Sequence, residues 1–360
     1  MSTRHVPSRC SGVFVLLAIC IPHCLCFSQP PQSIATPSQP PHLIMILQDD
    51  LGFYDVAFNG NARNADVTAN VSRLAREGIV LDAHYVFYWC SPTRRAFLSG
   101  RLPLHQGEML SDDASDDVDL RWDIISQRLE HAGYKSYWFG KGHTGYKSMA
   151  HLPTSRGFSN FTGFLHGMQG YTDADRWRNA GPFGDTTYSS DLYGQATMHT
   201  LAAHNASIPL FLYLPWQAVH SPYDPVPGWP HGSKKNDSNT YRGMLWRSDR
   251  YMGQLTAMLK SKGMWENTLI VYSADNGGRG AGVNFPLRGE KRTNFEGGIR
   301  AAAFVSGGLV PRSLRGTRSS LRLHIVDWCV SKGGWLGGCD SSSCTAWKVC
   351  RANSLGTGRQ

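Results

Sequence analysis

The chain has 360 residues, 41% of them hydrophobic and 18% charged, and its 36 Lys and Arg against 27 Asp and Glu give a formal net charge of +9. This composition excludes an intrinsically disordered or fibrous protein, and the length is enough for one large α/β domain or for a large domain with a small partner. The basic balance favours anionic partners such as nucleic acid, anionic lipid or sulfated and phosphorylated polymers. Because no dense run of Lys and Arg occurs, the charge is equally consistent with a general contribution to solubility.

The N-terminal segment has the layout of a secretory signal peptide. Arg4 and Arg9 precede an apolar run at residues 13–21. This run is too short to cross a bilayer. We expect residues 1–26 to be the signal peptide and residues 27–40, rich in Pro, Gln and Ser, to be a flexible lead. The alternative for the apolar run at residues 13–21 is a buried hydrophobic helix. No other apolar run predicts a transmembrane segment. Four N-x-S/T sequons fit a secreted glycoprotein and lie at Asn70, Asn160, Asn205 and Asn236.

Short apolar runs alternate with amphipathic segments along the rest of the chain. They predict strands at 42–48, 79–81, 135–139, 210–214 and 269–273. They predict helices at 71–77, 122–131 and 241–262. This alternation predicts a mostly parallel sheet flanked by helices. Ligands of such sheets gather beyond the carboxyl ends of the strands. Polar clusters follow three of these ends: Asp49-Asp50, Lys141 to His143, and Asp275-Asn276.

The composition changes after residue 310. Residues 321–328 predict one more strand, and Gly, Ser and Cys dominate from there to residue 360. We expect the main domain to span residues 41–310 and an atypical Gly/Ser/Cys-rich tail to span residues 311–360. The four cysteines of this tail match no zinc-binding spacing.

Cys90 is the only cysteine between the predicted signal peptide and the tail. A lone cysteine in the body of a secreted protein suggests a special role, although an inert buried thiol is the ordinary alternative. In the segment Cys90-Ser91-Pro92-Thr93-Arg94, a proline restrains the chain and Arg94 places a permanent cation near the thiol. The segment therefore predicts a reactive cysteine.

The same segment, followed by Leu98-Ser99-Gly100-Arg101, resembles the C-x-P-x-R signature of the sulfatase family. Five further segments resemble family motifs in order and spacing, at residues 43–52, 133–143, 214–222, 273–278 and 286–291. The resemblance covers residues 41–310 as the catalytic domain and is closest to the arylsulfatase B type, the N-acetylgalactosamine-4-sulfatases. It implies an alkaline-phosphatase-like sandwich with a central, mostly parallel sheet flanked by helices.

The resemblance also implies a calcium site and a modified nucleophile. Cys90 would be converted to formylglycine by the formylglycine-generating enzyme of the endoplasmic reticulum. Residue 90 would then join four oxygen ligands of Ca²⁺, which are supplied by Asp49, Asp50, Asp275 and the amide of Asn276. Hard oxygen ligands are the type that Ca²⁺ prefers, and they do not suit a protein zinc site.

The hydrated aldehyde of the family attacks sulfur, which implies roles for six residues of this chain. Cys90 supplies the nucleophile and Arg94 lowers the pKa of its hydroxyl. Lys141, His220 and Lys291 surround the sulfate oxygens, with His220 protonating the leaving alcohol and His143 acting as the base that releases sulfate. Each histidine, taken alone, is equally typical of a core or surface position. Trp216, Gln217 and Tyr223 are candidates for the substrate side or for packing.

Three substitutions and the C-terminal end depart from the family pattern. Gln48 replaces a small residue, Thr93 replaces serine, and Gly142 replaces a tryptophan, which predicts a looser loop there. The family continues into a small C-terminal domain that is largely missing here, so we expect a truncated form.

Three hypotheses on function follow from these observations. The first is an active sulfatase of the lysosome or extracellular space that acts on sulfated glycans or small sulfate esters and has no nucleic-acid partner. The second is a catalytically silent secreted protein that binds anionic glycans. The third is a two-zinc phosphomonoesterase or phosphodiesterase of the same superfamily, which Cys90 and the one-metal ligand set disfavour.

Overall fold

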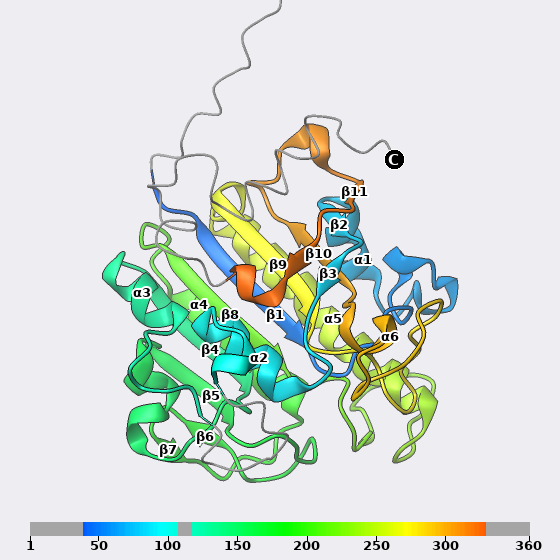
Figure 1. Cartoon of the computed structure of the whole chain (residues 1–360), viewed down its shortest axis with the longest axis horizontal. Coiled ribbons are helices and arrows are strands. Elements are labelled where there is room, and N and C mark those ends of the chain that lie inside the picture. The colour runs from blue at the N-terminus through cyan, green and yellow to red at the C-terminus, as the bar shows by residue number, and fades with distance from the viewer. Residues whose placement is uncertain (1–38, 107–116, 329–360) are drawn as a thin grey trace, which may run out of the picture. The chain divides into compact units, whose positions relative to one another are not determined.

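A large mixed sheet of ten strands forms the centre of the fold. The computed structural model describes residues 39–106 and 117–328, and the order of the strands across the sheet is β11-β2-β10-β9-β1-β8-β4-β5-β6-β7 (Figure 1). The five central strands run parallel to one another. Their bounds are β9 Thr268–Ala274, β1 His42–Gln48, β8 Leu210–Trp216, β4 Lys135–Lys141 and β5 Asn160–Phe164.

The central strands form because their residues are apolar on both faces. Every residue of β1, β8 and β9 is buried, which is the pattern of parallel strands covered on both sides. Ile44 of β1 pairs with Leu212 of β8 and with Ile270 of β9, and each of these side chains is completely inaccessible to solvent. The register aligns the carboxyl ends of the three strands, because Gln48 of β1 pairs with Trp216 of β8 and with Ala274 of β9.

Shorter strands complete both edges of the sheet. On one side, β10 (Ala303–Ser306) pairs antiparallel with β9 and with β2 (Ile79–Leu81), and β11 (Thr317–Ser319) pairs parallel with β2. On the other side, β6 (Trp177–Arg178) and β7 (Gly181–Pro182) form an antiparallel edge. A separate two-stranded sheet joins β3 (His84–Tyr85) to β12 (Leu323–His324).

Helices cover both faces of the sheet. Helices α2 and α3 lie in front of it in Figure 1 and α5 passes behind it, where α5 packs against α1 and α4. The bounds of the helices are α1 Ala69–Arg76, α2 Cys90–Ser99, α3 Ile125–His131, α4 Ser189–Ala203, α5 Ser238–Ser261 and α6 Glu296–Ile299. Short 3-10 helices connect these elements and include η8 (Ile325–Trp328), which packs against α2.

The predicted sheet of mostly parallel strands between helices is confirmed, with small changes at its ends. The strand predicted at 210–214 continues through Pro215 to Trp216. The single strand predicted at 321–328 is wrong in part, because only Leu323–His324 is extended and the 3-10 helix η8 follows. Beyond residue 310, β11 joins the main sheet and Trp328 is completely buried. The predicted signal peptide, most of the lead and the cysteine-rich end of the tail lie outside the described residues.

Candidate active site

Backbone hydrogen bonds join three loops beyond the carboxyl ends of β1, β8 and β9. The amide of Asp49 donates to the carbonyl of Ala218 at 3.0 Å, and the amide of Val219 donates back to the carbonyl of Asp49 at 2.7 Å. The amide of Asp275 donates to the carbonyl of Gln48 at 3.1 Å. Because parallel strands end at one edge of the sheet, these bonds extend the sheet register into the loops and bring their carboxylates together.

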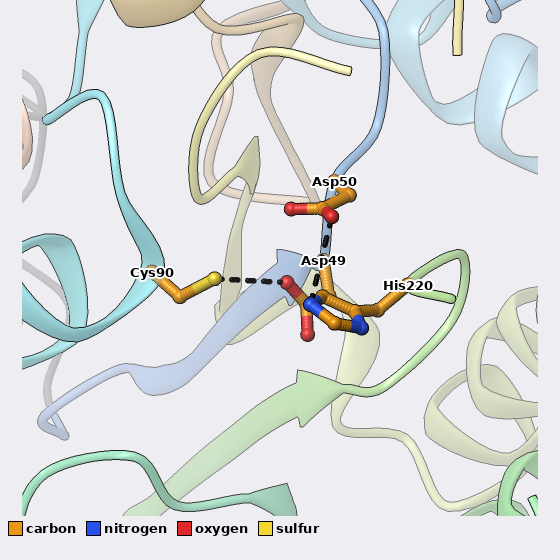
Figure 2. A group of neighbouring side chains, drawn as sticks. All are labelled: Asp49, Asp50, Cys90 and His220. Atoms are coloured by element: carbon orange, nitrogen blue, oxygen red, sulfur yellow. Dashed lines mark hydrogen bonds and ion pairs between the residues drawn. The ribbon is translucent and has the colours of Figure 1, made fainter. Parts of the chain in front are cut away.

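Asp50 turns the chain away from β1 in the left-handed region of backbone space, with φ of 53°. This conformation is uncommon for a residue with a side chain. It is held by two contacts, since the amide of Asp50 donates to Asp275 Oδ1 at 3.2 Å and Asn276 Nδ2 donates to Asp50 Oδ1 at 2.7 Å. Consecutive aspartates therefore reach the same buried site from one strand end (Figure 2).

Cys90 is the first residue of α2 and faces these carboxylates. Its side chain is buried, and its Sγ lies 3.5 Å from Asp49 Oδ1 (Figure 2). Arg94 follows four residues later, on the same face of the helix. The helix thus carries the thiol and the guanidinium to one place, as the C-x-P-x-R spacing predicts.

Two buried cations pair with the carboxylates of Asp275 and Asp49. Arg94 donates through Nε and Nη2 to Asp275 Oδ2 at 3.0 and 2.7 Å. The Nζ of Lys141, at the end of β4, lies 2.7 Å from Asp49 Oδ2. All four charged side chains are inaccessible to solvent, so each charge depends on its partner in place of water.

A third cation reaches the site from the far end of the chain. Lys291 Nζ lies 2.6 Å from Asp50 Oδ1, and His220 Nε2 lies 3.6 Å from Asp50 Oδ2. His143 has φ of 57° and lines the same cavity as Cys90. The amide of Gly142 donates to the carbonyl of Phe164, the last residue of β5, at 2.7 Å, and the amide of His143 donates to that of Leu165 at 2.9 Å. The loop expected to be looser is therefore tied to the sheet.

The charges of the site shift the pKa values of its members in different directions. Burial alone would raise the pKa of Asp49, but Lys141 and His220 hold that pKa well below its usual range. Burial, with the nearby Asp49 carboxylate, raises the pKa of Asp275 to about 6. The same two causes raise the pKa of the Cys90 thiol, so the unmodified side chain stays protonated near neutral pH.

The oxygen-rich end of the site fits a hard divalent cation. Asn276 Oδ1 is buried and has no hydrogen-bond partner among residues 39–106 and 117–328, although a buried acceptor ordinarily has one. One atom each of Asp49, Asp50, Cys90 and His220 lies within 4.8 Å of the others. Carboxylates together with an orphaned amide oxygen are the ligand types that Ca²⁺ prefers.

A cavity of about 400 Å³ opens above these residues. Its lining includes Asp50, Cys90, His143, His220 and Lys291. Further lining residues belong to none of the family motifs: Trp89, Met168, Asn236, Arg279 and Arg292. Trp89, Arg279 and Arg292 each directly adjoin a motif, which is the one signal that could have found them, whereas Met168 and Asn236 lie far from every family motif in the sequence.

The three aromatic and amide candidates near His220 divide between the cavity and the interior. Tyr223 lines the cavity, and its hydroxyl donates to the carbonyl of Arg279 at 3.1 Å. Gln217 instead accepts from Ser189 Oγ at 2.7 Å and is buried. Trp216 is buried and packs edge-on against a tyrosine of α5. Gln217 and Trp216 therefore pack in the interior and are not on the substrate side.

The layered sheet and the acidic site at its carboxyl edge define an alkaline-phosphatase-like α/β fold. The family profile described as Sulfatase matches residues 41–328, and this chain belongs to the sulfatase family. Mouse arylsulfatase J is 35% identical over 321 residues, which cover 83% of this chain and 53% of that protein. Mouse N-acetylgalactosamine-6-sulfatase is 27% identical over 307 residues, which cover 74% of this chain and 57% of that protein.

Solved structures agree with this assignment. The structure of Ps i-CgsB has a TM-score of 0.77 at 28% identity and covers 88% of this chain and 77% of that chain. Its complex with k-i-k-neocarrahexaose has a TM-score of 0.73 at 30% identity, with 80% and 70% covered. This chain spans about half the length of the two mouse sulfatases. Within the described residues, no helix has both the length and the hydropathy that crossing a membrane requires.

Proposed function

We propose that this chain hydrolyses sulfate monoesters through a formylglycine made from Cys90, with Ca²⁺ bound beside it. The observation that carries the proposal is the convergence of Cys90, Arg94 and Asp275 in one buried site within a chain of the sulfatase family. The C-x-P-x-R segment begins a helix whose first residue faces the carboxylates, which suits a nucleophile held next to a metal ion.

Asp49, Asp50, Asp275 and Asn276 would hold the metal ion. A bound Ca²⁺ would act as a Lewis acid that polarises a sulfate oxygen and favours ionisation of a neighbouring hydroxyl. The hydrated aldehyde at position 90 would supply the attacking oxygen. The unsatisfied Asn276 Oδ1 supports this assignment, because the structure otherwise leaves a buried acceptor without a partner among the described residues.

The cations of the chain would stabilise the negative charge that develops as the sulfur–oxygen bond breaks. Lys141 pairs with Asp49 and Lys291 pairs with Asp50, and both lysine side chains are buried, so they provide fixed positive charge in the site. His220 is the candidate general acid for the leaving alcohol. Burial lowers the pKa of His220 against the opposing effect of Asp49 and Asp50, so the protonated ring that would donate to the leaving alcohol is favoured at acidic pH. His143, on the same cavity, is the candidate base.

The substrate that we propose is a sulfated glycan, with galactosamine 4-sulfate groups as the first choice. Two observations support a glycan: N-acetylgalactosamine-6-sulfatase is among the relatives, and a similar solved structure holds a neocarrahexaose. We further propose maturation in the secretory pathway with the formylglycine-generating enzyme as a partner, followed by residence in the lysosome or outside the cell. The predicted signal peptide and the sequons support this route.

Two-zinc phosphoester hydrolysis is the less favourable alternative. A zinc pair requires more His and Asp ligands than the site brings together, and its nucleophile is a hydroxyl side chain in place of Cys90. A silent glycan-binding protein is also less favourable. The full set of charged residues is present in the site and its members are mutually paired.

Hydrolysis of 4-nitrophenyl sulfate by the chain coexpressed with the formylglycine-generating enzyme tests the proposal. We expect turnover that requires Ca²⁺ and that is lost in Cys90→Ala at unchanged secondary structure. A folded chain without turnover, or turnover that persists in Cys90→Ala, would contradict it. Metal analysis of the same sample separates one Ca²⁺ from two Zn²⁺.

A further inference from the structure

Two arginines on the rim of the cavity have no counter-charge among the residues that the structure describes. Arg279 and Arg292 both line the cavity and both are exposed. Neither guanidinium forms an ion pair with any residue in the described ranges 39–106 and 117–328. Asp50 is the only carboxylate among the described residues of the lining, and its Oδ1 is already paired with Lys291 at 2.6 Å. The rim therefore carries positive charge that no carboxylate in the described part of the chain neutralises.

Arg292 is held in place although it is exposed. Its guanidinium carbon lies 4.0 Å from the ring centroid of Trp89, the residue before Cys90, at a distance typical of a cation–π contact. Its amide donates to the carbonyl of Tyr88 at 2.8 Å. These contacts place an oriented guanidinium next to the start of α2, where it keeps its five donors available to a planar or tetrahedral anion.

Arg279 approaches the cavity from the loop that follows β9. The loop is anchored on both sides, since the amide of Gly278 donates to Asn284 Oδ1 at 2.8 Å and Tyr223 donates to the carbonyl of Arg279. Tyr223 is itself part of the lining. A rigid loop that presents an unpaired arginine at the mouth of a site is suited to bind charge on a ligand.

We propose that Arg279 and Arg292 bind a second anionic group of the substrate, so that the preferred substrate is a glycan with at least two negative charges near one another. This inference rests on the proposed function, because it takes the first anion to be the sulfate ester at Cys90. The cavity volume of about 400 Å³ is near the lower end of the range of about 300–1,000 Å³ that is typical of small-ligand sites. A single sulfated sugar would fill it, and a second anion would extend to the rim.

Binding to the Cys90→Ala chain, which cannot be converted, separates this recognition from turnover. The probes are N-acetylgalactosamine 4-sulfate, its 4,6-disulfate, and a disaccharide that joins the 4-sulfate sugar to a uronic acid. The disulfate tests a second sulfate, and the disaccharide tests a carboxylate as the source of the second charge. Calorimetry at low and high ionic strength measures each dissociation constant.

We expect the 4,6-disulfate, the disaccharide or both to bind more tightly than the monosulfate, with a preference that weakens as salt rises. Arg292→Gln and Arg279→Gln should each reduce the preference by about fivefold to tenfold. Arg288→Gln is the matched control, because Arg288 is also exposed and stacks on an aromatic ring, that of Phe295 at 4.1 Å, but does not line the cavity. The control should retain the preference.

Equal affinities for all three probes, or a preference that survives both rim substitutions, would overturn the inference. The turnover assay of the unsubstituted chain is a separate test. If turnover fails while an arginine-dependent preference is present, the proposed hydrolysis is contradicted and the recognition of two anionic groups still stands.

Discussion

Lys291 Nζ lies 2.6 Å from Asp50 Oδ1, although 241 positions separate the two residues in the chain. Asp50 leaves the first strand of the fold, whereas Lys291 belongs to a loop close to α6. Both side chains are nearly inaccessible to solvent. Burial favours the neutral form of Lys291, but the nearby carboxylates of Asp50 and Asp49 raise its pKa, so the ammonium remains charged. The loop therefore delivers a permanent charge to the carboxylate pair.

Removal of this charge should affect turnover more than folding. In Lys291→Met, we expect kcat/KM for 4-nitrophenyl sulfate to fall by about 10²–10³ because one fixed cation at the reacting sulfate is lost. The matched control is Lys260→Met, since Lys260 is exposed and contacts the ring of Trp265 at 4.7 Å, much as Lys291 contacts Trp89 at 4.8 Å. A similar loss of turnover in both variants would argue against a role for Lys291 in the reaction.

Calcium should stabilise the folded chain through Asn276. A ligand that binds only the native state raises stability by about 2.7 kcal/mol at a hundred times its Kd, and we expect thermal unfolding to show a rise with Ca²⁺. Asn276→Ala should remove most of this rise. Asn284→Ala is the control, because Asn284 is buried but its oxygen already accepts from Gly278. Asn284→Ala should unfold at a lower temperature and keep the rise. A rise that is unchanged in Asn276→Ala would contradict the assignment of this oxygen as a ligand.

Acid should destabilise the fold through His84. This histidine is buried beneath Trp328, whose indole donates to His84 Nε2 at 2.8 Å, and Ser273 Oγ lies 3.2 Å from its Nδ1. Burial, with a smaller effect of His324, lowers the pKa of His84 from 6.5 to about 3. A depressed histidine pKa means that the unfolded chain binds the proton first, so stability is present above pH 6.5 and is lost as pH falls toward 3.

The expected loss is about 2 kcal/mol between pH 6.5 and pH 5. Urea unfolding measures it, and in His84→Phe the dependence over this range should be weaker, at the cost of lower stability at pH 7. The exposed His199→Gln is the control and should leave the dependence unchanged. An identical pH profile in wild type and His84→Phe would contradict the prediction.

Asp55 should stabilise the fold at acidic pH, which is the opposite of the effect expected for His84. Its Oδ2 accepts from the hydroxyl of Tyr241 and from the amides of Gly52 and Val283, but burial outweighs these bonds and raises its pKa from 3.8 to about 6. The native state therefore binds the proton first, so this contribution is present below pH 3.8 and is lost as pH rises through 6. The stability of wild type relative to Asp55→Asn should fall by about 2 kcal/mol between pH 4.5 and pH 7. A constant difference between the two proteins would exclude this effect.

The buried strands were predictable because their apolar runs are continuous. The strand at 42–48 matches the sequence prediction at both ends, since a polar pair and then a glycine follow it. The strand predicted at 210–214 continues through Pro215 to Trp216 in register with β1. Residues 321–328 have strand-like composition, but only two of them find a partner in β3. Local pattern therefore identifies a strand more reliably than its end, because the end depends on the neighbouring chain.

The positions of the site residues were predictable only because several motifs occur together. Spacing alone could not show that Lys141, Arg94 and Lys291 each make their shortest ion pair with a different carboxylate. The rim residues Trp89 and Arg292 belong to no motif, and their contact forms only after the chain folds. Their placement depends on long-range packing that no local pattern records.

The state of residue 90 in the active protein tests the central claim most directly. Mass spectrometry of the tryptic peptide from residue 77 to Arg94 reports whether the side chain has lost its sulfur and gained an aldehyde. We predict that a preparation which hydrolyses 4-nitrophenyl sulfate carries the aldehyde at this position, and that its specific activity rises in proportion to the fraction converted. An active preparation in which residue 90 is entirely unmodified cysteine would contradict the account.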